Sequence, residues 1–224
     1  MPEKIHTTAA DLLETLNLNS NPINLIGMSR FGIQAKNGLG CSMPFLRNLA
    51  RQIRKDHSLA LELWETEVHD ARILASLLDL PLEVTQDQLI GWTYDFYSWD
   101  ICDQVIGNLF RHVPFFPNLI PGFCAANEEF VRRAGFAGMA VLAIHEKSWK
   151  PEKFEPWFPL LDVGLSDERN FVKKAVSWAL RQVGKRNSDM KNRVLEEIQE
   201  WEKYPLNGSA KWILRDVRQE LAKS

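Results

Sequence analysis

The second half of the chain repeats itself, and this constrains the fold more than any other feature. The sequence Phe-Val-Arg-Arg-Ala at residues 130–134 returns as Phe-Val-Lys-Lys-Ala at 171–175, and the segment 178–183 has a similar counterpart at 212–217. Helix-breaking clusters separate these copies, and no stretch alternates apolar and polar residues as a half-buried strand would. Helical units that return every three to four dozen residues predict an all-α HEAT-like solenoid of stacked antiparallel helix pairs with a concave groove, built as a single domain over residues 1–224.

Charge and cysteine content exclude several classes of protein. The 224 residues carry a formal net charge of -2, which argues against a uniformly basic nucleic-acid binder but allows a local basic stripe. The cysteines Cys41, Cys102 and Cys124 are widely spaced and form no metal-ligand motif, so we expect no metal site and a reducing cytoplasmic location. The N-terminus at residues 1–6 lacks a secretion pattern and no long apolar run occurs, so we expect no membrane association.

The first half also reads as a series of helices. Thr7 or Thr8 can cap a first amphipathic helix, and an apolar segment follows at residues 23–31. The loop at residues 32–40 contains three glycines without a phosphate-cradling spacing, so we interpret it as a connector. A further helix begins at residues 42–44. Its second face is basic, which fits either a solvated surface or a contact with a phosphate backbone.

A tryptophan and a carboxylate share one helix face in the middle of the chain. Ser98 is a good helix N-cap, and Trp99 and Asp103 lie four residues apart in the helix that follows. An indole beside an acid can grip a cation, or a sugar that develops positive charge. The alternative is that Trp99 fills a helix interface while Asp103 caps, pairs or faces solvent.

Two basic pairs occupy equivalent positions of the repeated helices. Arg132 and Arg133 in the first copy correspond to Lys173 and Lys174 in the second. If one pair faces the groove, the other is expected to face it too, which would produce a positive stripe suited to a phosphate backbone. Solvated helix ends would explain the same pattern.

These segments together resemble the AlkD-like DNA alkylation repair enzymes, which are HEAT-like repeat DNA glycosylases. The resemblance runs from about residue 28 to about residue 221. It depends on the segments 98–103, 130–134 and 171–181, with support from the segments 42–47 and 61–72. Each segment alone is a weak signal, whereas their joint order and spacing indicate the fold.

The resemblance assigns roles to individual residues. It implies that Asp103 is the catalytic carboxylate, that Trp99 and Trp178 are its flanking indoles, and that Arg133 holds a phosphate. Phe31 corresponds to a groove aromatic that is a Tyr in some relatives, so the hydroxyl is missing here while its packing is expected to remain. Further DNA-backbone contacts are expected from the other basic residues of the matching helices: Arg132, Lys173, Lys174, Arg181, Arg47 and Arg51.

The implied activity is excision of cationic alkylated bases, such as N3-methyladenine and N7-methylguanine, from double-stranded DNA. A cationic base leaves as a neutral one, so no general acid, metal or organic cofactor is needed, and a groove that grips the backbone need not contain a base pocket. We expect a monomer. Two other functions remain open: a DNA-binding relative without excision activity, and a protein-interaction scaffold. The isolated His69, His112 and His145 are each interpreted as an ordinary surface or interface histidine. Tyr94, Tyr97 and Trp92 could line the groove or pack between helices, and we favour packing.

Overall fold

The computed structural model describes residues 7–223, and across that span it contains thirteen α-helices and three short 3-10 helices without a β-strand. The all-α prediction is therefore confirmed, whereas the expectation about the N-terminal segment falls on residues outside the described span. The chain divides into two compact units, which we name the N-terminal unit (residues 1–114) and the C-terminal unit (residues 115–224). The single domain over residues 1–224 stays a prediction.

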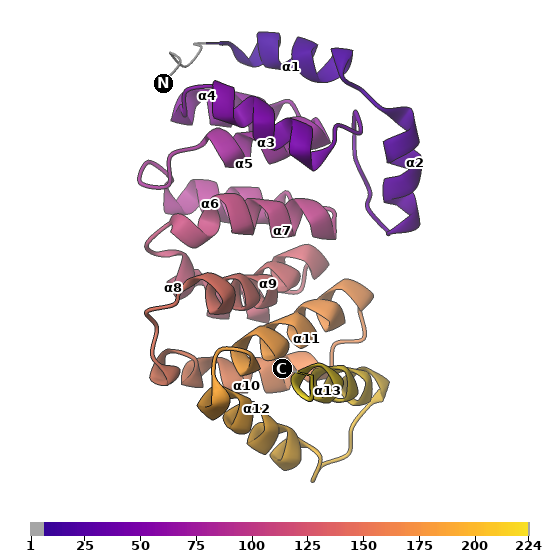
Figure 1. Ribbon diagram of the computed structural model, residues 1–224, viewed down its shortest axis with the longest axis vertical. Helices are drawn as coiled ribbons and strands as arrows, with labels where there is room; N and C mark the ends of the chain where they lie inside the picture. The colour runs from indigo at the N-terminus through magenta and orange to yellow at the C-terminus, as the bar shows by residue number, and fades with distance from the viewer. Residues whose placement is uncertain (1–6, 224) are drawn as a thin grey trace. The chain divides into compact units, whose positions relative to one another are not determined.

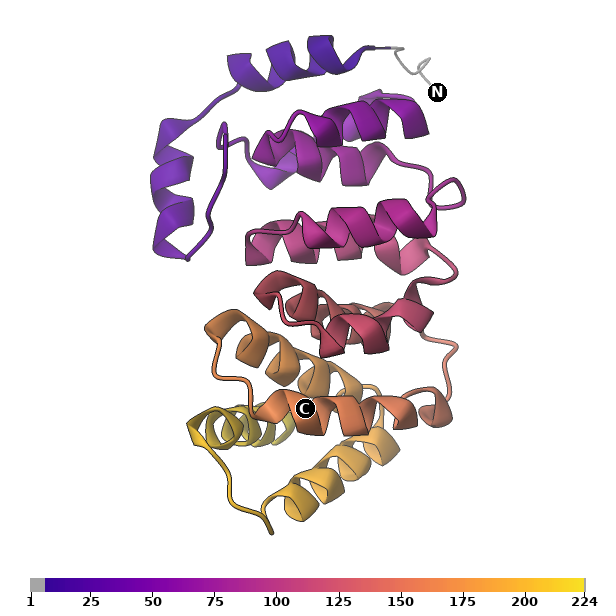
Figure 2. The ribbon, with the colours of Figure 1, turned by 180° about the vertical axis from the view of Figure 1, so that it is seen from behind.

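In the N-terminal unit, α3 to α7 lie along one another, and α2 stands crosswise beside one end of them, as both Figure 1 and Figure 2 show. The apolar faces of α3, α4 and α5 pack together around fully buried leucines. The Trp64 and Trp92 rings stack in parallel with centroids 4.0 Å apart, which ties α4 to α6. The elements are α1 (Ala9–Leu18), α2 (Pro22–Arg30), α3 (Met43–Gln52), α4 (His57–Glu65), α5 (His69–Leu78), α6 (Gln86–Tyr94), α7 (Trp99–Asn108) and η1 (Phe110–His112).

The first three helices of this unit begin with side-chain caps. Thr8 and Asp11 form a reciprocal capping box at α1. The Asn21 side chain accepts hydrogen bonds from the first turn of α2, where Pro22 occupies the first helical position. The Ser42 hydroxyl accepts from the Phe45 N–H at α3. Local sequence thus specifies where these three helices begin.

In the C-terminal unit, the long helices α9 and α11 form the centre and the remaining helices pack against them. The repeated Phe130 and Phe171 meet ring to ring with centroids 5.6 Å apart, so the duplicated sequence becomes a duplicated contact. Gly135 lets α9 approach α8, because a Cβ there would stand 2.7 Å from the Cys124 backbone nitrogen. The elements are α8 (Phe116–Ala125), α9 (Glu129–His145), η2 (Pro151–Lys153), η3 (Glu155–Trp157), α10 (Phe158–Leu165), α11 (Asn170–Gly184), α12 (Ser188–Trp201) and α13 (Gly208–Leu221).

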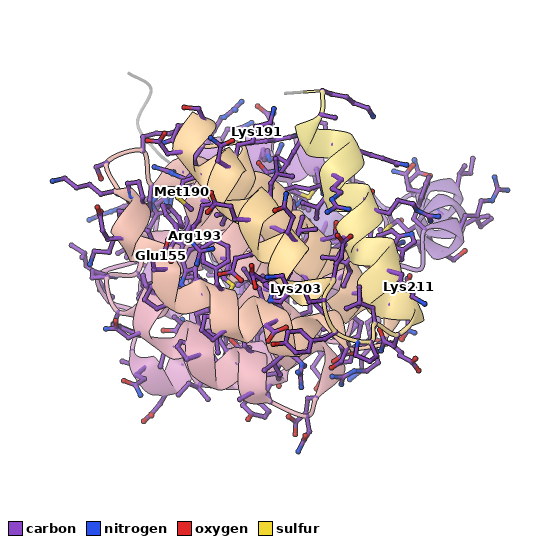
Figure 3. The ribbon with its side chains drawn as sticks, turned by 90° about the horizontal axis from the view of Figure 1, so that it is seen from below. Glu155, Met190, Lys191, Arg193, Lys203 and Lys211 are labelled. Atoms are coloured by element: carbon purple, nitrogen blue, oxygen red, sulfur yellow. The ribbon has the colours of Figure 1, made fainter. Side chains whose placement is uncertain are left out.

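One arginine of α12 fastens that helix to the chain before α10. Figure 3 shows Arg193 and Glu155 side by side, and the Arg193 Nη2 lies 3.0 Å from a Glu155 carboxylate oxygen. The same guanidinium lies 4.3 Å from the centre of the Phe158 ring. A cation of this unit is therefore used to join two helices.

The two units differ in charge. The N-terminal unit carries 14 Asp and Glu against 9 Lys and Arg, a net charge of -5, and the C-terminal unit carries 15 against 18, a net charge of +3. The overall charge of -2 therefore hides an acidic and a basic part. Within residues 7–223, no helix is both long enough and apolar enough to cross a membrane.

Candidate functional site

Trp99 is the first residue of α7, and its indole is fixed in place. The indole N–H donates a hydrogen bond to the Phe31 carbonyl oxygen over 3.1 Å, which joins α7 to the end of α2. The side chain is half-buried. Asp103 lies one turn further along α7 and is also half-buried, so the predicted pairing of an indole and a carboxylate on one helix is present in the N-terminal unit.

Ser98 occupies the predicted N-cap position of α7 but does not cap the helix with its side chain. Its hydroxyl donates to Asp100 Oδ1 over 2.7 Å and accepts from the Gln34 N–H over 3.3 Å. The hydroxyl proton thus goes to the neighbouring carboxylate, a charged acceptor, while the hydroxyl oxygen accepts from the Gln34 N–H and not from the first turn of α7. Ser98 therefore links α7 to the loop that follows α2.

A buried polar network lies behind Trp99. The fully buried His69 at the start of α5 is 2.9 Å from Asp100 Oδ2 through Nε2 and 3.0 Å from the Tyr97 hydroxyl through Nδ1. Burial acts to raise the pKa of Asp100, but hydrogen bonds from His69 and Ser98 outweigh it and hold that pKa below its usual value. Burial raises the pKa of the Tyr97 hydroxyl, which stays protonated and can donate to His69.

A second buried carboxylate organises the loop between α2 and α3. Asp70 is 1% exposed, and its two oxygens accept hydrogen bonds from the Leu39 and Cys41 N–H groups, each over 2.7 Å. Gly40 lies between them with φ +74°, where a Cβ would stand 2.3 Å from the Asn21 carbonyl oxygen. Burial, together with the nearby Asp70 carboxylate, raises the pKa of the Cys41 thiol to about 12, so this thiol is not a reactive one.

Phe31 contributes its backbone carbonyl to the site and not the ring packing that was expected. Its ring is 74% exposed and makes little packing contact, although packing was the part of its role expected to remain. Its backbone carbonyl instead positions Trp99. A backbone acceptor is available whatever the side chain, so the missing hydroxyl does not affect this contact.

The predicted basic pair on α9 is tied into the fold of the C-terminal unit. Arg133 is 5% exposed, and its Nη1 donates to the Phe171 carbonyl oxygen over 2.6 Å. The Arg132 Nε lies 3.2 Å from Asp167 Oδ2. Burial acts to raise the pKa of Asp167, but hydrogen bonds from Arg169 outweigh it and keep that pKa low. Both arginines of the pair thus contact groups that begin or precede α11.

Two cations predicted to bind DNA from α11 also have partners within the unit. The Lys173 ammonium lies 5.1 Å from the centre of the Trp212 ring, so the half-buried Trp212 is its cation–π partner. Arg181 forms an ion pair with Asp216 over 3.4 Å. Their roles in DNA binding stay predictions.

Lys174 and Trp178 complete the predicted set on α11. Lys174 is exposed, and Trp178 is half-buried one turn further along. The structure thus brings Trp99, Asp103 and Phe31 together in one unit, and Arg132, Arg133 and the α11 residues together in the other.

The basic face of α3 is open to solvent. Arg47 and Arg51 are both exposed, whereas Leu46 of the same helix is fully buried. Among the described residues, no group of three or more His, Cys, Asp or Glu gathers as a metal site would require. The role of Arg47 and Arg51 in DNA binding stays a prediction.

Sequence inspection missed the three buried groups behind Trp99. His69 was interpreted as an ordinary surface or interface histidine, and Asp70 and Asp100 were not singled out. The adjacent His69-Asp70 pair at the start of an apolar helix was the available signal, because charged residues are rarely fully buried without a partner. Their partners come from segments about thirty residues away, which no local pattern reveals.

One solved structure is similar to this chain along nearly its whole length. It is described as "a new family of proteins related to the HEAT-like repeat DNA glycosylases with affinity for branched DNA structures". The TM-score is 0.77 at 14% sequence identity, and the match covers 95% of each chain. The likeness confirms the predicted HEAT-like repeat fold. A comparison with curated protein sequences returned no match.

The sequence itself supports a family assignment. Residues 12–216 match the family described as DNA alkylation repair enzymes, a span that contains α7 of the N-terminal unit and both repeated helices of the C-terminal unit. The resemblance found in the sequence motifs is thereby confirmed, and the chain belongs to the DNA alkylation repair enzyme family.

Proposed function

We propose that the protein is a monofunctional DNA glycosylase that removes bases made cationic by alkylation from duplex DNA. The observation that carries the proposal is the fixed Trp99 indole one helical turn from the Asp103 carboxylate, both partly open to solvent. Family membership supports the DNA substrate. The roles that the resemblance assigns to Arg133 and Trp178 are part of the same proposal.

The reaction needs few groups because the leaving base is already charged. The bond between C1′ and the base nitrogen breaks with its electron pair moving to the base, which departs neutral. Positive charge then develops on the deoxyribose. The Asp103 carboxylate stabilises this charge, and the face of Trp99 adds a cation–π attraction that grows as the charge develops.

Water completes the reaction. A water molecule directed by Asp103 adds its oxygen at C1′ and releases a proton to the carboxylate, which passes it to solvent. The hydrogen bond from the indole N–H to the Phe31 carbonyl keeps the ring in one orientation throughout.

The test is base release from DNA treated with a methylating agent, measured under single-turnover conditions for the wild type, Asp103→Asn and Asp87→Asn. Asp87 is an exposed aspartate in the first turn of α6 and serves as the matched control. Asp103→Asn should slow release about 100-fold or more, because the amide cannot stabilise the developing charge, and Asp87→Asn should be unaffected. A wild type that releases no more base than spontaneous depurination does would sink the proposal.

A second candidate function is DNA binding without excision. The solved relative is described by its affinity for branched DNA, and this chain shares its fold over 95% of its length. Binding of a four-way junction and of a matched duplex across a salt series would detect this function. Replacing an exposed arginine that contacts phosphate, Arg47→Gln or Arg51→Gln, should reduce the slope of log affinity against log salt by roughly 0.9. Junction preference without base release would favour this second function.

A further inference from the structure

Helix α2 has little apolar support. None of its side chains is fully buried, and Ile23 and Ile26 are 79% and 57% exposed. A cavity of about 560 Å³ lies between α2 and the helices α5 and α7, and Figure 1 and Figure 2 show α2 standing crosswise beside one end of the stacked helices. Because few apolar contacts hold α2 against the core, its position depends on hydrogen bonds at its two ends.

The start of α2 is fastened to α5 through the loop that contains Gly40. The Asn24 amide donates to the Gly40 carbonyl over 2.9 Å, and the Asn21 N–H donates to a carbonyl of the same loop over 2.7 Å. The two oxygens of the buried Asp70 in turn hold the backbone N–H groups on either side of Gly40. This end of α2 is thus anchored independently of α7.

The end of α2 is fastened to α7 through a turn that also carries the Phe31 carbonyl. The Ile33 N–H donates to the Met28 carbonyl in the last turn of α2 over 3.1 Å. One residue later, the Gln34 N–H donates to the Ser98 hydroxyl over 3.3 Å. The segment from Phe31 to Gln34 therefore joins the last turn of α2 to the start of α7.

The orientation of the Trp99 indole depends on this turn. The indole N–H donates to the Phe31 carbonyl over 3.1 Å, and the side chain is otherwise half open to solvent. The carbonyl keeps its place only while the turn does. A shift of the turn at Gln34 therefore reaches the indole.

The Ser98 hydroxyl is held ready for Gln34 by a buried carboxylate. Its proton is committed to Asp100 Oδ1 over 2.7 Å, which leaves its oxygen to accept from the Gln34 N–H. The second oxygen of Asp100 lies 2.9 Å from Nε2 of the fully buried His69. Asp100 is thus fixed from both sides, and it fixes the orientation of the Ser98 hydroxyl.

We propose that Ser98 and Asp100 are positioning residues for the base-release reaction: they hold the turn after α2 and, through the Phe31 carbonyl, set the orientation of the Trp99 indole. The inference rests on the proposed glycosylase function and adds two residues that need touch neither base nor sugar. Trp99 lies between them in the chain, so its backbone and its ring N–H are held by the same short network.

A purely structural role for the network is the alternative, and Ser76 offers a matched control for it. Ser76 is a fully buried serine of α5. Its hydroxyl donates to the Ile73 carbonyl over 2.7 Å and accepts from the amide of Asn108, the last residue of α7, over 3.1 Å. Ser76→Ala therefore removes a buried hydroxyl that joins α5 to α7 at the end of α7 opposite Ser98.

The first measurement follows the indole N–H groups of the eight tryptophans by NMR in the full chain labelled with ¹⁵N-tryptophan. The Trp99 signal is the one absent from Trp99→Phe. Ser98→Ala and Asp100→Asn should shift this signal and speed its exchange with solvent by about fivefold or more, because the Phe31 carbonyl is no longer held in place. Ser76→Ala should leave it unchanged. Circular dichroism melting establishes that each variant is folded.

The second measurement is base release from methylated DNA under single-turnover conditions. Ser98→Ala should lower the maximal rate about tenfold and change the half-saturating DNA concentration less than about twofold, because a misplaced indole loses charge stabilisation and not DNA contacts. In a Trp99→Phe background, which lacks the indole N–H, Ser98→Ala should cause little further loss. Ser76→Ala should leave the rate unchanged.

The two measurements together separate the possible failures. If the wild type releases no base but the Trp99 signal changes in Ser98→Ala and not in Ser76→Ala, the glycosylase function fails while the positioning of the indole stands. A Trp99 signal that is unchanged in both Ser98→Ala and Asp100→Asn overturns the proposal, and so does an equal change in Ser76→Ala. With an active wild type, the proposal is also overturned if Ser98→Ala leaves base release unaffected or slows it equally in the Trp99→Phe background.

Discussion

The two units use their charged residues in opposite ways. In the N-terminal unit, buried carboxylates accept hydrogen bonds from loop backbone and hold α2 above a cavity, as Asp70 does for residues 39–41. In the C-terminal unit, cations bind internal partners and join successive helices, as Arg133 does with Phe171. Charged side chains of a repeat protein can join one repeat to the next. A basic motif by itself therefore does not locate a DNA-binding surface.

The largest loss of stability is expected from substitution of Asp70. Asp70→Ala removes a buried acceptor of two partly buried N–H groups, and each loses its hydrogen bond, so the free energy of unfolding should fall by about 3–5 kcal/mol. Urea denaturation measures this loss. A fall below 1 kcal/mol would mean that residues 39–41 do not depend on the carboxylate.

The next prediction contrasts two cations of the repeated helices. Arg133→Ala removes the guanidinium that donates to the Phe171 carbonyl and opens a cavity at a buried site, so it should cost about 2–3 kcal/mol of unfolding free energy. Lys174→Ala, at an exposed position, should change it by less than about 0.5 kcal/mol. Denaturation of both variants compares them directly, and equal losses would break the contrast.

A third prediction concerns the loss of stability at acidic pH. The pKa of Asp100 is lower in the folded chain than its ordinary value of 3.8, so the unfolded chain binds more protons wherever the two states differ. Its contribution to stability is therefore fully present above the ordinary value and is lost as the pH falls through the folded value. Asp100→Asn should flatten the fall of stability in this acid range, which melting temperatures across a pH series would measure. An unchanged acid profile would contradict the assignment of charge to Asp100.

The smallest contribution to stability is expected from the cation–π contact between Lys173 and Trp212 in the C-terminal unit. A double-mutant cycle with Lys173→Met and Trp212→Leu should give a coupling of about 0.5–1 kcal/mol, since the ammonium lies over the ring at a partly exposed site. A coupling near zero would contradict this contact. If Lys173→Met also reduced the salt dependence of DNA binding, Lys173 would instead be a phosphate contact.

The structure agrees with the sequence where local signals are strong. Caps at Thr8, Asn21 and Ser42 begin their helices as local hydrogen-bond chemistry requires. Ser98 shows the limit of this reasoning. Its position as N-cap was predictable, but its hydroxyl donates to Asp100 and accepts from the Gln34 N–H, a donor 64 residues away that no local pattern reveals.

The sequence by itself determined the all-α repeat character, the helix starts and the pairing of Trp99 with Asp103 on one helix. These depend on periodicity and on spacings of a few residues, which the backbone geometry of a helix converts directly into position. Only the tertiary structure decided that His69, Asp70 and Asp100 are buried, that Arg133 holds a carbonyl, and that a cavity lies under α2. Their partners are some thirty to forty residues distant along the chain, and local sequence does not encode contacts between segments so far apart.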